Sequence, residues 1–116
     1  MTVDFDFTDR VALVTGVAGE LGSAVATAFD DAGATVAGLD IVDPDDETLS
    51  LEDPTRIDYY QADATDEAAV ADAIDAVVAD HGRLDALANV AGTWRGGDPL
   101  HETDVDTFDF LFDVNL

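Results

Sequence analysis

Three glycines near the start of the chain follow an apolar run at a constant interval. The segment VALVT at 11–15 leads into Gly16, Gly19 and Gly22. A helix that begins after a strand offers free backbone amides and the positive end of its dipole to an anion. Glycine lets the turn tighten and lets a phosphate group approach the main chain. The spacing therefore predicts either a pyrophosphate site between a strand and a helix or an ordinary tight turn.

A carboxylate ends the next apolar run, Thr35–Asp40, about 20 residues beyond the glycines. At the tip of a strand, Asp40 can accept hydrogen bonds from both hydroxyls of an adenosine ribose, whereas a 2′-phosphate would meet like charge. No arginine or lysine occurs between residues 11 and 55. These residues favour NAD over NADP. The alternative is that Asp40 is one of the many surface aspartates.

Apolar runs alternate with helical patterns along the chain, and these elements would position the glycines and Asp40. Strands are expected at 11–15, 35–40, 57–62 and 84–89. Apolar residues at helical spacing extend from the glycines to Gly33, and a second stripe extends from a cap at Thr65 or Asp66 to Gly82. A third helix is expected from about residue 104, and a loop at 43–56. This order predicts an α/β fold with an open parallel sheet wound by helices.

The acidic composition limits the partners of the chain. Residues 1–116 form one domain at most, with 27 acidic side chains, four basic ones, no lysine and a formal net charge of -23. Such a surface repels nucleic acid and anionic membranes, because phosphate binding depends on cationic side chains. The carboxylates are spread along the chain, which favours a halophilic protein whose self-repulsion is screened by salt. Weak metal binding is the alternative for DPDDE at 43–47.

The chain shows no signal for an oxidising or membrane environment. It has no cysteine, so a disulfide framework and a thiolate metal site are excluded. No apolar run approaches the roughly 20 residues of a membrane span. The N-terminal segment MTVDFDFTDR lacks the basic start and apolar stretch of a signal peptide. We therefore expect a cytoplasmic protein.

Four segments in order resemble the short-chain dehydrogenase/reductase family: TGVAGELG at 15–22, DAT at 63–65, GRLDALANVAG at 82–92 and FDVNL at 112–116. The resemblance implies a Rossmann-like, doubly wound parallel sheet with about four strands in the order 3-2-1-4. It also implies an NAD-binding domain over 1–116, equivalent to the amino-terminal half of such a protein.

The resemblance implies a role for residues in each matching segment. The expected cofactor-binding residues are Gly16, Val17, Gly19, Glu20, Leu21, Gly22, Asp40, Ile41, Asp63, Ala64, Asn89, Ala91 and Gly92. Asp63 and Ala64 would border the adenine, and the residues from Asn89 onward would lie along the cofactor. Asn115 would be the first member of the catalytic Asn-Ser-Tyr-Lys set.

Several of these residues also have a purely structural interpretation. Asn89 could hold a neighbouring strand end, and Asp63 could cap the helix that follows it. Ala91 and Gly92 are small, which a crossing of strands also requires. Arg95 follows the loop onto the carboxyl edge of the sheet and is either a surface side chain or a contact for an anionic substrate.

Two departures from the family pattern bear on activity. Glu20 occupies the place of the second glycine in T-G-x-x-x-G-x-G, and its charge near a pyrophosphate opposes cofactor binding unless it turns away or salt screens it. The family also needs a tyrosine whose pKa is lowered by a lysine four residues later. The chain has no lysine, and Tyr59 and Tyr60 lie in the adenosine half. We expect no turnover by this chain alone.

The preferred hypothesis is a dehydrogenase half that transfers hydride between a nicotinamide cofactor and an alcohol or ketone only when completed. One alternative is a non-catalytic NAD-binding module, or a subunit completed by a separate carboxyl-terminal chain. Another is an extended-type nucleotide-sugar epimerase remnant, because the spacing T-G-x-x-G-x-x-G is similar to that branch. A small-molecule substrate is expected only for the completed protein. A bare sheet edge and apolar Phe108, Leu111 and Phe112 predict a homo-oligomer.

Overall fold

The computed structural model describes residues 4–116; residues 1–3, which begin the segment examined for a signal peptide, lie outside the described residues. Its sheet has four parallel strands: β1 (Val11–Thr15), β2 (Thr35–Asp40), β3 (Asp58–Gln61) and β4 (Ala86–Asn89). The strand order β3-β2-β1-β4 confirms the predicted Rossmann-like sheet. β3 and β4 are shorter than expected. Ile57 belongs to the turn before β3, where its amide donates to the Pro54 carbonyl.

Three α-helices accompany the sheet: α1 (Glu20–Asp31), α2 (Glu67–His81) and α3 (Val105–Asn115). Two short 3₁₀ helices, η1 (Pro54–Arg56) and η2 (Leu100–Glu102), lie in the connections, so the expected 43–56 loop ends in a helical turn. Asp66, not Thr65, caps α2 by accepting a hydrogen bond from the Ala69 amide. Gly82 ends this helix at φ 79°, a left-handed conformation that favours glycine.

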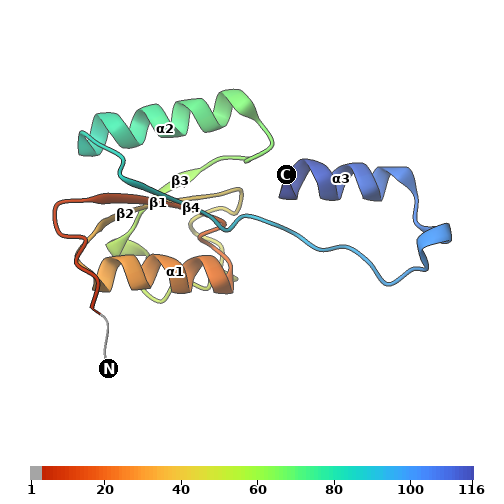
Figure 1. Cartoon of the computed structure of the whole chain (residues 1–116), viewed down its shortest axis with the longest axis horizontal. Coiled ribbons are helices and arrows are strands. Elements are labelled where there is room, and N and C mark those ends of the chain that lie inside the picture. Colours follow the sequence, from red (N-terminus) through yellow and green to blue (C-terminus); the bar gives the residue numbers. More distant parts are fainter. Residues whose placement is uncertain (1–3) are drawn as a thin grey trace.

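The sheet separates two apolar layers (Figure 1). α1 covers one face and α2 covers the other. Successive residues of β1 point to opposite faces: Val14 packs into the layer under α1, and Leu13 into the layer under α2. Both are almost completely buried. Strands covered on both sides need such continuous apolar runs, which is why β1 and β2 could be recognised from their sequence.

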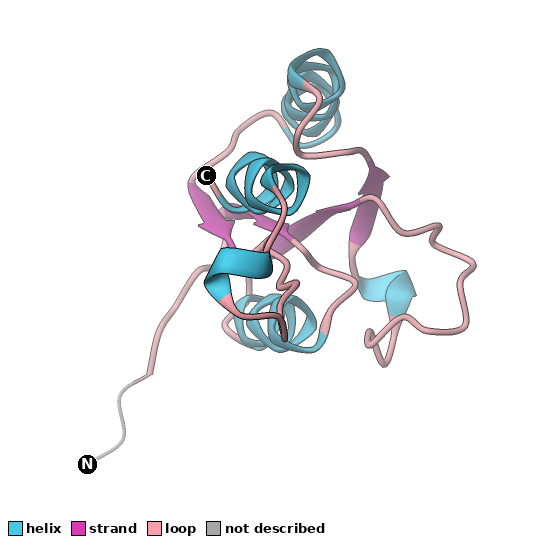
Figure 2. Ribbon diagram, turned by 90° about the vertical axis from the view of Figure 1, so that its right-hand side faces the viewer, coloured by secondary structure: helices cyan, strands magenta, loops and turns pink. Residues whose placement is uncertain are grey.

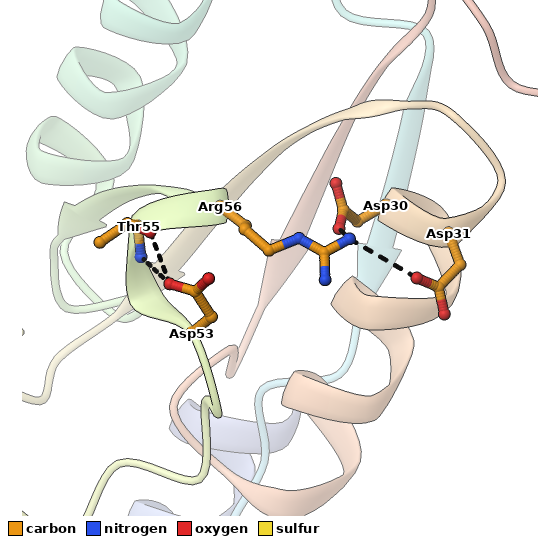
Figure 3. Close-up of polar contacts among 5 residues, drawn as sticks. All are labelled: Asp30, Asp31, Asp53, Thr55 and Arg56. Carbon is orange, nitrogen blue, oxygen red and sulfur yellow. Dashed lines mark hydrogen bonds and ion pairs between the residues drawn. The ribbon is translucent and has the colours of Figure 1, made fainter.

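The connection between β2 and β3 is held at three places against α1 and the bend that precedes it. The Ser50 amide donates to the Ala18 carbonyl at 3.0 Å, and the Leu51 side chain is buried in the layer beneath α1. Arg56 forms ion pairs with Asp30 and Asp31 at the end of α1 (Figure 3). Because these carboxylates lie at the negative end of the helix dipole, the guanidinium offsets an unfavourable charge there.

The last part of the chain is much less packed. β4 forms one edge of the sheet, and residues 90–104 lead away from it to α3 (Figure 1). In Figure 2, α3 stands in front of the strand ends, between the layers of α1 and α2. The Cα radius of gyration is 15.9 Å, whereas a compact chain of this length has about 13 Å. No helix of the described residues is long and apolar enough to cross a membrane.

Candidate dinucleotide-binding site

The glycine bend brings β1, α1 and the segment after β4 into close contact. Gly16 has φ 67°, and a Cβ on it would lie 2.8 Å from the Ala91 Cα. A Cβ on Gly22 would lie only 1.9 Å from the Gly16 carbonyl oxygen. The segment after β4 can therefore approach the bend only because Gly16 lacks a side chain, and the first turn of α1 can do so only because Gly22 lacks one.

Most amides of the bend already have acceptors within the protein. The amides of Gly16 and Val17 donate to the Leu39 carbonyl, and that of Gly19 donates to the Gly16 carbonyl. The Ala18 amide donates to Asp40. Within the described residues, the first-turn amides of α1 at positions 20–22 have no acceptor. Among the described amides of the bend, these three remain without a protein acceptor, and the expectation that the bend holds the pyrophosphate stays a prediction.

Three of the expected ligand residues, Val17, Glu20 and Leu21, differ in how far their side chains are exposed. The Val17 side chain is fully buried against Gly38, so it packs in the core, and the expected contact of Val17 with the cofactor stays a prediction. Glu20 and Leu21 are exposed at the start of α1. The α1 N-cap, Gly19, has no side chain with which to occupy the helix end. An anion could reach this end, and it would meet the Glu20 carboxylate beside it.

Asp40 lies beside the glycine bend. Its Oδ2 accepts a hydrogen bond from the Ala18 amide at 3.0 Å, and its Oδ1 accepts one from the Val42 amide at 3.2 Å. A carboxylate has about four lone-pair positions, so each oxygen keeps one for another donor. The side chain is half-buried and lines a cleft. Ribose hydroxyls are donors that suit these remaining positions.

The cleft has a volume of about 410 Å³ and lies at the carboxyl ends of the strands. It is lined by seven of the expected residues, which come from four separate segments: Gly16, Asp40, Ile41, Asp63, Ala64, Ala91 and Gly92. The sequence interpretation missed seven others: Leu39, Ala62, Thr65, Thr93, Phe110, Asp113 and Val114. The three from α3 are spaced i, i+3, i+4, so they lie on one face of the helix. The sequence interpretation followed the apolar stripe from Val105, which lies on another face.

Asp63 closes a turn of its own at the cleft. Its Oδ1 accepts hydrogen bonds from the Thr65 hydroxyl at 2.7 Å and the Thr65 amide at 2.9 Å. These two bonds, the hydroxyl first, lower the pKa of Asp63 below its usual value. Since Asp66 caps α2, the alternative that Asp63 is the helix cap is wrong. Its other oxygen remains available at the cleft wall.

Asn115 connects α3 to the segment after β4. Its Oδ1 accepts from the Thr93 amide at 2.9 Å, and its Nδ2 donates to the carbonyls of Thr93 and Leu111. A Cβ on Gly92 would lie 2.8 Å from the Asn115 Oδ1, so glycine is needed for this approach. The amide thus positions the wall of the cleft. Its expected catalytic role stays a prediction.

Asn89, Ala91 and Asn115 line a second hollow, of about 340 Å³, which adjoins the cleft and shares Leu39 and Ala64 with it. Asn89 is exposed there and no hydrogen bond of its side chain is recorded in the described residues, so its two interpretations stay open. The guanidinium carbon of Arg95 lies 4.1 Å from the ring centre of Phe110, a cleft residue. This is a cation–π geometry.

Two carboxylates of the acidic 43–47 cluster accept hydrogen bonds from residues two positions further along the chain. Asp43 accepts from the Asp45 amide, and Asp46 accepts from the amide and hydroxyl of Thr48. Over residues 4–116, no three His, Asp or Glu side chains converge as a metal site would require.

Comparison with known proteins agrees with this geometry. The sequence model of the family described as short chain dehydrogenase matches residues 10–116. The chain belongs to the short-chain dehydrogenase family. It is 37% identical to the D-threitol dehydrogenase of Mycolicibacterium smegmatis, covering 100% of this chain and 46% of that protein. It is 35% identical to (+)-borneol dehydrogenase 1 of Salvia officinalis, covering 92% and 42%.

Solved structures show the same fold. A short-chain glucose/ribitol dehydrogenase from Brucella melitensis superimposes with a TM-score of 0.84 at 28% identity, covering 98% of this chain and 49% of that one. The ligand-free aldohexose dehydrogenase of Thermoplasma acidophilum gives 0.80 at 29%, covering 95% and 40%. The chain thus spans less than half the length of these relatives. Family and fold together imply a nicotinamide cofactor.

Proposed function

We propose that the cleft is the adenosine side of an NAD site, and that the chain is the dinucleotide-binding part of an alcohol or ketone dehydrogenase. The observation that supports this most directly is Asp40, which lies between the glycine bend and the cleft with acceptor capacity to spare. Parallel α/β sheets bind such ligands at the carboxyl ends of their strands. The two glycine contacts described above provide the close backbone approach that a dinucleotide needs.

Each wall of the cleft has a separate task in this proposal. Asp40 accepts the ribose hydroxyls, and Ile41, whose side chain is 61% exposed, covers one face of the adenine. Asp63 and Ala64 border the other side of the base. The free amides at the start of α1 receive the pyrophosphate. The bound dinucleotide would supply the hydride chemistry, and the chain's own residues hold and orient it.

Electrostatics favour NAD over NADP. Asp40, Asp63 and Asp113 line the cleft, and none of its lining residues is basic. A 2′-phosphate placed next to Asp40 would be repelled, whereas two hydroxyls would be bound.

We further propose that the chain does not catalyse turnover by itself. It has no lysine, and the pKa of each of its two tyrosines is too high for proton transfer near neutral pH. Burial, followed by neighbouring aspartates, raises the pKa of Tyr59 to about 12. Burial and the hydrogen bond to Asp80 raise that of Tyr60 to about 12. A general acid needs a pKa near the working pH, so the tyrosine and lysine would have to come from outside these 116 residues.

The substrate class follows from relatives alone. Two of these relatives are dehydrogenases of D-threitol and of (+)-borneol, which are both alcohols. We propose an alcohol/ketone pair for the completed protein. The glycine spacing T-G-x-x-G-x-x-G is the one feature that favours the nucleotide-sugar epimerase alternative.

Self-association is proposed for the open side of the molecule. Phe108 is 56% exposed and Phe112 is 50% exposed on α3, and Leu87 is 52% exposed on the edge strand β4. Apolar side chains at such an edge gain free energy from burial against a second surface. Light scattering across a concentration series should show oligomers, and a strict monomer at the highest concentration would contradict the proposal.

Calorimetry with NAD and NADP in molar salt tests the proposed function. We expect NAD to bind at least about tenfold more tightly, which corresponds to about 1.4 kcal/mol. Asp40→Asn should remove most of this preference, because the amide keeps the size of the side chain but loses its charge. Wild-type protein that binds neither dinucleotide would refute the proposal.

A further inference from the structure

Two side chains of β3 hold the backbone that follows Asp40. The Tyr59 hydroxyl donates to the Val42 carbonyl at 2.6 Å, and the Gln61 Nε2 donates to the Ile41 carbonyl at 3.1 Å. Residues 59 and 61 are two positions apart on one strand, so their side chains project from the same face. They therefore reach consecutive carbonyls of the same turn.

These contacts continue directly to the Asp40 carboxylate. Val42 accepts from Tyr59 at its carbonyl and donates from its amide to Asp40 Oδ1, and this amide shares its peptide unit with the Ile41 carbonyl that Gln61 holds. The other carboxylate oxygen is held by the Ala18 amide of the glycine bend. The orientation of the Asp40 carboxylate thus depends on two backbone amides, that of Ala18 and that of Val42, and the second lies in the turn that β3 holds.

The Tyr59 hydroxyl is suited to a permanent anchoring role. Burial, and then the charges of Asp40, Asp43 and Asp46, raise its pKa to about 12. It therefore remains a hydrogen-bond donor throughout the physiological pH range. An unpaired carbonyl at Val42 would be left if this donor were removed, and the turn would then be free to move toward solvent.

We propose that Tyr59 and Gln61 are positioning residues that orient Asp40 and Ile41 for the adenosine ribose and base. They act through the turn at 41–42 and touch no part of the cofactor themselves. The inference rests on the proposed function, and it adds that the preference for NAD over NADP is set partly by the third strand.

The neighbouring tyrosine provides a matched control. Tyr60 points to the opposite face of the sheet, where its hydroxyl donates to Asp80 on α2 at 2.7 Å. Tyr60→Phe and Tyr59→Phe each remove one hydroxyl and one hydrogen bond of similar length. Only the second change disturbs the turn beside the cleft.

The experiment measures the affinities of NAD and NADP by calorimetry in molar salt for wild type, Tyr59→Phe, Gln61→Leu and Tyr60→Phe. Thermal unfolding of each variant verifies the fold. We expect Tyr59→Phe and Gln61→Leu to weaken NAD binding about fivefold and NADP binding less, so that the affinity ratio falls. Tyr60→Phe should leave the ratio unchanged, since a general loss of stability affects both ligands equally.

The outcomes separate this inference from the proposed function. If wild type prefers NAD but the ratio is the same in Tyr59→Phe and Gln61→Leu, the positioning role is wrong and the proposed function stands. An equal fall of the ratio in Tyr60→Phe would also overturn it. If wild type binds neither dinucleotide, the proposed function and the inference fail together.

Discussion

The molecule has a packed side, formed by β1 and β2 with their covering helices, and an open side, formed by β4 and α3. The two differ in how completely their residues are buried. On one side, β1 and β2 are buried beneath α1 and α2, and Val14 and Ala37 have no exposed surface. On the other side, β4 alternates half-buried and exposed residues, and none of the α3 residues is fully buried. Residues 90–104 connect β4 to α3 without an α-helix or a strand.

This difference separates two functions that a dehydrogenase must combine. The packed side contains the glycine bend and Asp40, so the adenosine part of the proposed site needs no further chain to hold its shape. The open side contains Asn115 and the apolar face of α3, on which Phe108 and Phe112 are at least half exposed. We therefore expect ligand binding and turnover to respond differently to mutation.

The largest effect is expected at Gly22. Gly22→Ala places a methyl group where the Gly16 carbonyl stands, so the backbone must move and the bend must open. A loss of stability on the order of 4 kcal/mol and of measurable NAD binding should follow. Denaturant titration and calorimetry measure both. Gly19→Ala is the control, because its Cβ would lie an ordinary 3.6 Å from the same oxygen; equal damage in the two variants would contradict the packing argument.

A pair of leucines tests the contrast in packing directly. Leu13→Ala empties a site that is 2% exposed and should cost about 3 kcal/mol of unfolding free energy. Leu87→Ala, on the edge strand at 52% exposure, should cost less than about 1 kcal/mol in the monomer. Denaturation at low protein concentration compares them. A cost for Leu87→Ala that matches Leu13→Ala would mean that the open side is covered in solution.

The packed side is also the side that could be predicted from the sequence. β1 and β2 have the expected bounds because their runs are apolar on both faces, and the helix ends are marked by Asp66 and Gly82. The start of β4 was placed too early, at Leu84. Asp85 lies just before the strand, where its carboxylate accepts a hydrogen bond from the Val11 amide and pairs with Arg83. Such a contact depends on a partner 74 positions away, which no local pattern reveals.

The candidate site was predictable where function requires a particular residue type. Glycines and a strand-end aspartate have a direct physical reason, whereas Phe110 and Val114 reach the cleft only because the 90–104 connection returns α3 to the strand ends. Internal hydrogen bonding of the bend could not be foreseen either, since most of the acceptors, Leu39 and Asp40, belong to β2.

A smaller effect is expected from the charge beside the free amides of α1. Glu20→Gln should strengthen NAD binding about fivefold in dilute buffer and have little effect in molar salt, because the Debye length falls from about 10 to 3 Å. Glu67→Gln is the matched control, since Glu67 stands in the first turn of α2. Calorimetry at several salt concentrations distinguishes them. An equal gain of affinity in both variants would mean that the effect comes from the net charge of the protein and not from the position of Glu20.

The smallest effect concerns Asp63. Thr65→Val removes the hydroxyl that contributes most to the low pKa of this carboxylate, so the pKa should rise toward its usual value. A lowered pKa stabilises the folded state above the unfolded pKa of about 3.9, and this contribution is lost as the pH falls through the folded value. The variant should therefore lose less stability on acidification than wild type. NMR titration of the carboxyl carbons measures the shift, and Thr48→Val, which affects Asp46, should leave Asp63 unchanged.

The central position of β1 determines the order in which the sheet can assemble. β1 pairs with β2 through Val11 and Thr35, and with β4 through Ala12 and Ala86. Closing the second, much longer loop costs more chain entropy before any contact rewards it. We expect the nascent chain to form its β1–α1–β2 unit first and to add β4 last. Refolding kinetics should then be slowed by mutations in Val14 and left almost unchanged by mutations in Leu87.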